Sequence, residues 1–408
     1  MKILLINPNI LDPPIFPVGL EYNAEFLKNY GCDVEILDMN SEVDYRKADD
    51  CDLVLIGIRN LDSGAGNIDS EMNKLRQIVG KLRARYSGDI GIAGTAVNIL
   101  PEKLADFLQV EYALVQKGFG AVRALIDNLR HGRRDKRIYR DYTGSVNGVF
   151  RRNFLDKSFY LKNQGRIGVA TKFGCPFQCQ YCNYPAIDGN AIVLRDPGEV
   201  AEEVECIVEN GAARIFFCDS NFNIPEVHAN RILEKLLEKK LAVDIDGFNN
   251  PHPRAFTGEY LDLLSRFGNN HIHFGIDSLS DAVLYAIRKG FTVSDVEKAV
   301  HLCRMKGITY SCSLLFGHPS ETTESVEESF RNVKRLGFSY VDVSSMVRIY
   351  PFTELETIAL KEGIINKTDS LMYPFFYPVR EEVLQAIEKG RRENPCCHEP
   401  GYQQYITL

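Results

Sequence analysis

The sequence predicts an α/β protein with two alternating strand–helix regions and a short C-terminal extension. Short apolar runs alternate with amphipathic helical stretches from the first residues, and the alternation restarts near residue 166. Strands that alternate with helices favour parallel sheets covered by helices. We therefore expect four segments: a doubly wound, Rossmann-like domain over 1–131, a linker over 132–165, a partial (β/α)6 barrel over 166–356, and a helical, aromatic extension over 357–408.

Composition and charge are those of an ordinary globular chain. The 408 residues are 45% hydrophobic and 25% charged, which argues against disordered and fibrous classes. The formal net charge is −7, so no bulk positive field recruits nucleic acid. No apolar run reaches the roughly 18 residues of a spanning helix, and the first residues lack a signal-peptide layout. We expect a cytoplasmic protein without a nucleic-acid partner or a membrane span.

The first region supplies five predicted strands, with helical spacing clearest at 19–30 and 71–86. The strands are residues 2–7, 32–37, 52–58, 89–93 and 111–115. Ligands of doubly wound domains bind beyond the carboxyl ends of the strands. Polar or glycine-rich segments follow those ends: Asn9, residues 59–67, Gly94-Thr95 and Gly118-Phe119. Ordinary turns have the same composition, so that alternative stays open.

The linker, residues 132–165, is rich in arginine, lysine and aromatic residues. Because the whole chain is acidic, a solvated connector that packs on both neighbours is favoured over a nucleic-acid arm.

The second region supplies six more strands and the helices between them. The strands are residues 167–171, 213–218, 242–248, 271–276, 309–316 and 339–349. The helices are residues 198–210, 227–239, 258–266, 281–286, 293–306 and 321–336. In α/β barrels the chemistry sits at the C-terminal ends of the strands, so polar or reactive residues are expected there.

Three of the eleven cysteines fall within eight residues, directly after the first strand of the second region. Cys175, Cys179 and Cys182 have the spacing C-x3-C-x2-C. Thiolates suit zinc or iron–sulfur clusters, but a structural zinc site normally closes with four ligands, and no fourth Cys or His is nearby. A [4Fe–4S] cluster on three thiolates keeps one iron open for a ligand. The alternative is three buried structural cysteines.

This loop, with Tyr181 before its last cysteine, resembles the cluster motif of the radical S-adenosylmethionine (SAM) superfamily. The resemblance implies that the open iron binds the methionine part of SAM. It also implies an external flavodoxin- or ferredoxin-type reductant, whose electron cleaves SAM to a 5′-deoxyadenosyl radical. The cofactors then carry the difficult chemistry, and the protein supplies position and a dry pocket.

The resemblance also implies SAM contacts at other strand ends, besides Tyr181. Asp219 and Asn221 follow the second strand, where superfamily members place polar groups on the methionine amine; an Asx turn is the alternative. Asp277 and Ser278 follow the fourth strand, where Glu-Ser is common, and the aspartate shortens the reach by one carbon. Arg348, on the sixth strand, suits a fork to a carboxylate or a structural ion pair.

The order of the two regions resembles cobalamin-binding radical SAM proteins over roughly residues 1–360. That resemblance implies a first domain that holds cobalamin, with weak candidate contacts at Asn9, Gly94, Thr95, Gly118 and Phe119. Two departures stand out. Residues 1–130 contain no histidine to serve as a lower axial ligand, and residues 116–120 replace the usual Gly-Glu-Gly-Glu turn. Phe119 could pack on a corrin or fill a pocket that no longer binds one.

These features predict a radical SAM enzyme, most directly a cobalamin-dependent methyltransferase that methylates carbon or phosphorus of a small, natural-product-like molecule. One alternative is a radical SAM enzyme with a vestigial cobalamin domain that performs dehydration, rearrangement, ring formation or 3-amino-3-carboxypropyl transfer. Another is a non-catalytic metal-binding or sensor protein. Cys396 and Cys397, in the extension, are candidate catalytic thiols, with an ordinary loop as the alternative.

Overall fold

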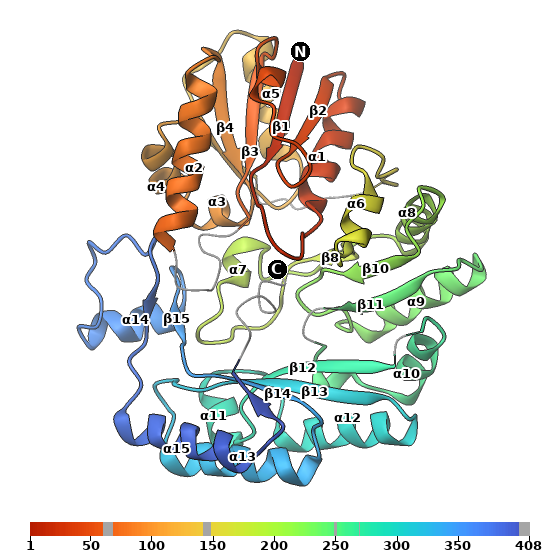
Figure 1. The fold of residues 1–408 in the computed structure, drawn as a ribbon, viewed down its shortest axis with the longest axis vertical. Coiled ribbons are helices and arrows are strands. Elements are labelled where there is room, and N and C mark those ends of the chain that lie inside the picture. Colours follow the sequence, from red (N-terminus) through yellow and green to blue (C-terminus); the bar gives the residue numbers. More distant parts are fainter. Residues whose placement is uncertain (60–67, 142–147, 249–250, 269, 400–408) are drawn as a thin grey trace. The chain divides into compact units, whose positions relative to one another are not determined.

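The computed structural model describes residues 1–59, 68–141, 148–248, 251–268 and 270–399 (Figure 1). The chain divides into two compact units. The first comprises Met1–Gly174, Ala186–Phe216 and Lys240–Val243, and the second comprises Cys175–Pro185, Phe217–Lys239 and Asp244–Leu408. Of the loop predicted at 59–67 as a ligand-facing segment, all but Arg59 lies outside the described residues.

A six-stranded parallel sheet, in the order β2-β1-β3-β4-β5-β6, forms the centre of the first unit. Its strands are β1 (Lys2–Asn7), β2 (Asp33–Asp38), β3 (Leu53–Gly57), β4 (Asp89–Ala93), β5 (Tyr112–Gln116) and β6 (Ile138–Asp141). The first five confirm the predicted strands to within a residue or two. The strand order reverses between β1 and β3, which is where doubly wound sheets bind ligands.

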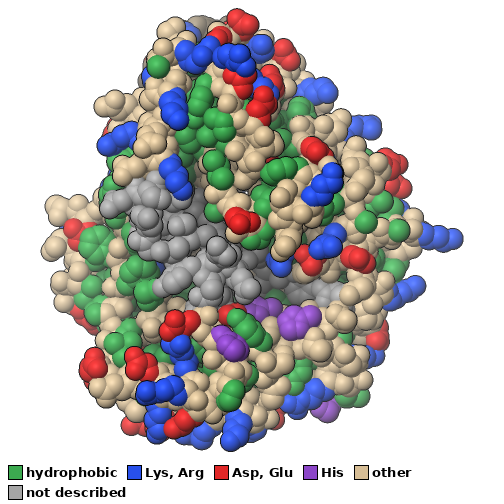
Figure 2. All heavy atoms as spheres, in the orientation of Figure 1, with side chains coloured by type: hydrophobic (Ala, Val, Ile, Leu, Met, Phe, Trp, Pro, Cys, Tyr) green, Lys and Arg blue, Asp and Glu red, His purple; other side chains and the backbone are tan. Residues whose placement is uncertain are grey.

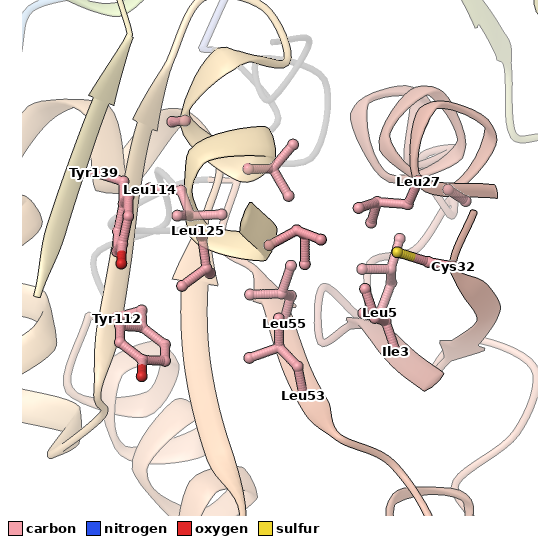
Figure 3. Close-up of a cluster of buried hydrophobic side chains, with 14 of the residues drawn as sticks. Ile3, Leu5, Leu27, Cys32, Leu53, Leu55, Tyr112, Leu114, Leu125 and Tyr139 are labelled. Carbon is pink, nitrogen blue, oxygen red and sulfur yellow. The ribbon is translucent and has the colours of Figure 1, made fainter. Parts of the chain in front are cut away.

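Helices cover both faces of this sheet, so its strands are apolar on both sides. The helices are α1 (Val18–Asn29), α2 (Ile68–Arg83), α3 (Thr95–Ile99), α4 (Pro101–Leu108) and α5 (Gly120–Arg130), with a 3₁₀ turn at Tyr45–Ala48. In Figure 3, Leu27 of α1 and Leu125 of α5 approach sheet residues such as Leu5 and Leu55. Cys32 lies in the same apolar cluster and behaves as a small hydrophobic residue.

Strand β6 lies inside the segment that was expected to be a linker. Its Tyr139 is 1% exposed and packs edge-on against Tyr112, which draws the strand onto the sheet. The sequence did not predict this strand because it contains one apolar pair, Ile138-Tyr139, with charged residues on both sides. Arg137 and Arg140, on either side of that pair, form ion pairs with acidic residues of α4, so this segment is not an unpaired basic arm.

The first unit also contains shorter elements around a buried ionic network. They are α6 (Lys157–Lys162), β7 (Ile167–Val169), β8 (Lys172–Phe173), β9 (Val193–Leu194), α8 (Pro197–Glu209) and β10 (Arg214–Phe217). The Arg152 side chain is fully buried and lies 2.6 Å from Glu21 of α1 and 2.6 Å from Glu203 of α8. Arg195 adds a second contact to Glu203 at 2.7 Å. This network ties α1 to α8.

A parallel sheet of order β12-β13-β14-β17 forms the centre of the second unit. The strands are β12 (His271–Asp277), β13 (Thr309–Leu315), β14 (Val341–Ser344) and β17 (Cys397–His398). In Figure 1, α11 (Asp281–Ala286), α12 (Val293–Met305) and α13 (Thr323–Leu336) lie on one side of this sheet. The carboxyl ends of β12, β13 and β14 meet at one edge, as the barrel prediction requires.

The remaining elements, which belong to the second unit except for the last two residues of α7, include one correction. They are α7 (Tyr184–Ile187), α9 (Glu226–Glu238), β11 (Asp244–Phe248), a 3₁₀ turn (Pro253–Ala255), α10 (Gly258–Ser265), β15 (Arg348–Ile349), α14 (Glu354–Lys361), β16 (Phe375–Phe376) and α15 (Glu381–Glu393). The prediction of one strand over 339–349 was wrong, because β14 ends at Ser344 and β15 pairs antiparallel with β16. None of the described helices has the length and apolar character needed to cross a membrane.

Candidate functional site

The three-cysteine loop occupies residues 175–185 of the second unit and is held by backbone hydrogen bonds from two directions. The amide of Gln180 donates to the carbonyl of Ile287 at 2.9 Å, and its carbonyl accepts from the amide of Leu355 at 2.9 Å. Within the loop, the amide of Cys182 donates to the carbonyl of Cys179 at 3.1 Å. The main chain between the cysteines is therefore fixed by its neighbours.

An aromatic stack fixes the first half of the same loop. The rings of Phe177 and His252 lie 4.3 Å apart and are almost parallel, at 5°. Asn223 holds the backbone of His252 by accepting from its amide at 2.8 Å and donating to its carbonyl at 3.0 Å. Burial lowers the pKa of His252 to about 4, so its ring is neutral near pH 7.

Deprotonation of the thiols of the loop is unfavourable when no metal is bound. Burial raises the pKa of Cys179, with Lys289 acting in the opposite direction, and burial together with the neighbouring Cys179 raises the pKa of Cys182 to about 12. Metal cations offset such a cost, because thiolates bind in place of thiols.

Three cysteine thiols are the metal-binding donors of this loop. A structural zinc site closes with four ligands. An iron–sulfur cubane places each thiolate on a different iron. The donor set therefore fits a cluster.

Two predicted residues follow β10, and one of them contacts this loop. The side-chain amide nitrogen of Asn221 lies 3.7 Å from the Cys175 sulfur, to which it donates. Asp219, two residues earlier, is 3% exposed. Its carboxylate and the amide oxygen of Asn221 are acceptors of the kind an ammonium group needs.

A buried phenol, carboxylate and ammonium meet at the end of β12. Tyr181, from the cysteine loop, donates a short hydrogen bond to Asp277. Lys289 Nζ lies 2.8 Å from Asp277, 3.1 Å from the carbonyl of Gly275 and 3.5 Å from the Tyr181 hydroxyl. A register shift between Gly275 and Asp277, with a φ of 67° at Asp277, turns this carboxylate toward the loop.

The ion pair decides the charge of this group of residues. Burial acts to lower the pKa of Lys289, but the carboxylate of Asp277 outweighs it and the net shift is upward. Burial and the same carboxylate raise the pKa of Tyr181 far above its ordinary value. At neutral pH the three groups are therefore an ammonium, a carboxylate and a neutral phenol. Such a set can bind polar parts of a zwitterionic ligand.

His318 completes this region and was not predicted as a site side chain. Its ring lies 5.2 Å from that of Tyr181, is 3% exposed, and has no hydrogen-bond partner for either nitrogen among the described residues. Burial lowers its pKa to about 4. The sequence signal that indicates it is a glycine, Gly317, directly after a predicted strand; its φ of 94° forms a tight turn after β13. An orphaned neutral ring beside Tyr181 suits a polar ligand.

Glu321, three residues later, is a second functional candidate that the sequence did not indicate. It is 1% exposed, and one carboxylate oxygen accepts from Ser325 at 2.5 Å. Burial raises its pKa to about 7. An acid that titrates near neutrality is unusual and marks candidate functional regions.

Four further predicted residues make other contacts. Ser278 is fully buried and bonds to Ser329 of α13, as a packing residue does. Arg348 places its guanidinium 4.5 Å from the ring centre of Tyr350. Cys396 and Cys397 were candidate catalytic thiols, but Cys397 pairs with Val341, the first residue of β14. That is the end of the strand opposite to the carboxyl edge, so the structure does not bring these thiols to the site.

The weak cobalamin contacts predicted in the first unit lie at strand ends, but their groups are used internally. The Asn9 amide donates to Asn7 and to the Gly57 carbonyl, and the Thr95 hydroxyl donates to the Arg59 carbonyl at 2.6 Å. A methyl group on Gly94 would meet the Ile58 carbonyl at 2.4 Å. Phe119 stacks on Phe26 at 4.5 Å. Gly118 is buried beside it. These side chains mainly stabilise their own loops.

Comparison with known proteins supports this picture. Residues 170–333 match the model of the radical SAM superfamily. The tryptophan 2-C-methyltransferase of Streptomyces laurentii is 21% identical over 86% of this chain and 73% of its own. The tRNA-2-methylthio-N(6)-dimethylallyladenosine synthase of a Hydrogenobaculum species is 23% identical over 78% of this chain and 75% of its own.

A solved structure shows the fold. The radical SAM methyltransferase TsrM from Kitasatospora setae, with cobalamin and a [4Fe–4S] cluster bound, superposes with a TM-score of 0.81. The match covers 90% of this chain and 79% of that chain at 23% identity. The predicted α/β fold class is thereby confirmed, and the radical SAM resemblance is supported by the family model that matches residues 170–333.

Proposed function

We propose that this chain is a cobalamin-dependent methyltransferase of the radical SAM kind, which methylates carbon or phosphorus of a small molecule. The observation that carries the proposal is the meeting of three elements at one edge of the second unit. Asn221, after β10, contacts the cysteine loop at Cys175, and the Asp277–Lys289 pair, after β12, contacts it at Tyr181. Each supplies a different part of a site for a cluster and a zwitterionic cofactor.

The cluster and SAM fit the residues present. Cys175, Cys179 and Cys182 would hold a [4Fe–4S] cluster, which supplies one-electron chemistry when an external flavodoxin- or ferredoxin-type reductant delivers the electron. Asp219 and Asn221 would accept from the amino group of SAM. Residues 181, 277 and 289 would orient its carboxylate and ribose, and residue 318 would add a neutral donor or acceptor. Arg348 stays a weaker candidate for the carboxylate, and Ser278 for the same contact.

Cobalamin is supported by the likeness in fold rather than by side chains. The similar structure was solved with cobalamin bound, and its match includes most of this chain. When bound, a corrinoid supplies methyl-carrier chemistry. Since Asn9, Thr95 and Phe119 are engaged within the first unit, we assign them no catalytic step.

A small-molecule substrate is favoured over nucleic acid. The net charge is −7, and three basic residues of the 132–141 segment form ion pairs with acidic residues: Arg134, Arg137 and Arg140. On the face shown in Figure 2, positive and negative side chains are interspersed. Nucleic-acid sites instead concentrate positive charge on one face.

The test is an anaerobic reconstitution with iron, sulfide and cobalamin, followed by turnover with methyl-labelled SAM. Tryptophan is the first acceptor, because a relative is named for it, and tRNA is the second. We expect the label in tryptophan or another small molecule, and none with Cys175→Ala. Deoxyadenosine without methyl transfer, and without retained corrinoid, would favour the vestigial-domain alternative. If SAM were turned over equally by the wild type and Cys175→Ala, the cluster assignment would fail.

A further inference from the structure

A continuous row of hydrogen bonds joins alternating hydroxyl and imidazole groups on one face of β12 and β13. Thr309 Oγ1 lies 2.8 Å from His271 Nδ1, and His271 Nε2 lies 2.8 Å from Ser311 Oγ. The same Ser311 oxygen lies 2.8 Å from His273 Nδ1, and His273 Nε2 lies 2.9 Å from Ser313 Oγ. We call these five residues the histidine–hydroxyl row.

The strand register produces the row. In the parallel ladder three pairs face each other: His271 with Thr309, His273 with Ser311, and Gly275 with Ser313. Each ring therefore bridges the hydroxyl opposite to it and the next one along the strand. Successive side chains of a strand alternate between its faces, so all five groups share one face. Thr309 and His271 are exposed, Ser311 is 3% exposed, and His273 and Ser313 are half-buried, so the row begins at solvent and passes through a buried hydroxyl.

The strand register places polar groups next to the inner end of the row, Ser313. Ser313 faces Gly275, whose carbonyl accepts from Lys289 at 3.1 Å, and Lys289 pairs with Asp277 at 2.8 Å. On its other side Ser313 faces Asp342 of β14. That carboxylate is 4% exposed, and its Oδ1 has no hydrogen-bond partner among the described residues. Neither neighbour of the inner end is apolar.

The outer end sets the direction of the hydrogen bonds. Thr309 Oγ1 also lies 2.9 Å from the carbonyl of Asn270, which can only accept, so the hydroxyl donates there. His271 Nδ1 must then donate to Thr309, and its Nε2 must accept from Ser311. Because Ser311 has one proton and donates it to His271, it must accept from His273 Nδ1. His273 Nε2 must then accept from Ser313. Every donor thus points toward the exposed end.

Both rings are neutral at rest. Burial lowers the pKa of His271. Burial and His271 lower the pKa of His273, while Asp342 of the adjacent strand acts in the opposite direction. A neutral ring donates at one nitrogen and accepts at the other, which this row requires.

We propose that the histidine–hydroxyl row is a proton relay between solvent at the amino ends of β12 and β13 and the polar site at their carboxyl ends. Each hop breaks one O–H or N–H bond and forms the next. One proton enters at Ser313 for each proton that leaves at Thr309, and no electron moves. Asp342 stabilises His273 while it carries the extra proton. Buried ionisable groups of the site can then exchange protons without opening the site to water, whatever the substrate is.

The direct test removes the hydroxyl that both rings share. Ser311→Ala interrupts the row, Ser311→Thr keeps a hydroxyl, and Ser339→Ala is a matched control, since the Ser339 hydroxyl donates to the Tyr310 carbonyl, outside the row. Imidazole ¹⁵N labelling of the eight histidines reports the tautomer and the rate at which each ring proton exchanges with water. We expect the same Nδ1–H tautomer for both rings, and about tenfold slower exchange at His273 in Ser311→Ala.

The outcomes separate the relay from a structural ladder. Exchange at His273 that is unchanged or faster in Ser311→Ala, or opposite tautomers in the two rings, overturns the relay. Turnover of SAM with tryptophan is the second readout: it should slow in Ser311→Ala, recover in Ser311→Thr and stay normal in Ser339→Ala. Wild-type turnover in Ser311→Ala also overturns the relay. If the wild-type protein methylates nothing, only the proposed function fails, and the exchange rates alone decide on the relay.

Discussion

Replacing Arg152 with methionine should destabilise the first unit, because it removes a buried cation and leaves its anionic partners in place. The Arg152 side chain is 0% exposed, as are those of Glu21 and Glu203, and each carboxylate lies 2.6 Å from it. Burial alone would lower the pKa of Arg152, but the two carboxylates outweigh it and raise the pKa. The native state therefore depends on this cation remaining charged.

The expected loss in the free energy of unfolding depends on which cations remain near the two glutamates. Breaking a buried ion pair by removing one partner costs about 3–5 kcal/mol. Arg195 still contacts Glu203 at 2.7 Å, and Lys157 lies 3.8 Å from Glu21. We therefore expect the lower end of that range, about 3 kcal/mol. Replacing Glu203 as well, with glutamine, should recover part of the loss, since fewer unpaired charges then stay buried.

The assay is urea unfolding of the full chain followed by a probe in the first unit, with Arg134→Met as the matched control. Arg134 pairs with Asp89, but its side chain is 61% exposed, and exposed pairs contribute about 0–1 kcal/mol. A loss in Arg152→Met no larger than in Arg134→Met would refute the reasoning. It would mean that water or rearrangement of the two glutamates replaces the missing charge.

Three further predictions each concern a single residue. Glu321 has a pKa of about 7 in the folded protein, against an ordinary value of 4.5. Between these pH values the native state binds one proton more than the unfolded state, so the free energy of unfolding should fall by about 3 kcal/mol as the pH rises from 4.5 to 7. Glu321→Gln should remove this pH dependence from the midpoints of urea unfolding. Gly94→Ala should lower the free energy of unfolding by at least about 2 kcal/mol, because φ is +112° and the new Cβ would meet a carbonyl oxygen at 2.4 Å. Gly132 also has a positive φ but has open space around it, so Gly132→Ala should cost only about 1 kcal/mol. Thermal unfolding of both variants measures the difference. Lys289→Met should cost about 3 kcal/mol by leaving Asp277 buried without its cation, and the double variant with Asp277→Asn should be more stable than Lys289→Met in calorimetry; equal stabilities would contradict the pairing.

Most of the fold followed from periodicity, and the exceptions have identifiable causes. Strands such as 2–7 and 89–93 were predicted because buried parallel strands are short and continuously apolar. Strand β6 was missed because only Ile138 and Tyr139 are apolar within a charged segment, and the contact with Tyr112 that recruits them is distant in sequence. The single strand predicted over 339–349 split because an apolar run does not reveal which partner strand each half will join.

The candidate site was predictable only in part. Local spacing determined the cluster loop, since Cys175, Cys179 and Cys182 are ligands whose relation to one another is set within eight residues. Spacing could not show that Cys396 and Cys397 lie beside Val341, the first residue of β14, since that depends on where the last strand, β17, joins the sheet. Nor could it show that His318 faces Tyr181, a contact between segments 137 residues apart.

The sequence by itself therefore determined the α/β class, the order of the two regions and the cluster ligands, because each depends on interactions between near neighbours in the chain. Tertiary structure alone decided the charge and the connections of the site. The Asp277–Lys289 pair, the orphaned His318 ring and the histidine–hydroxyl row arise where separate strands and loops come into register. Burial and the neighbouring charges then set their ionisation, and the Asn270 carbonyl sets the hydrogen-bond direction of the row; both are properties of the packed molecule rather than of any one segment.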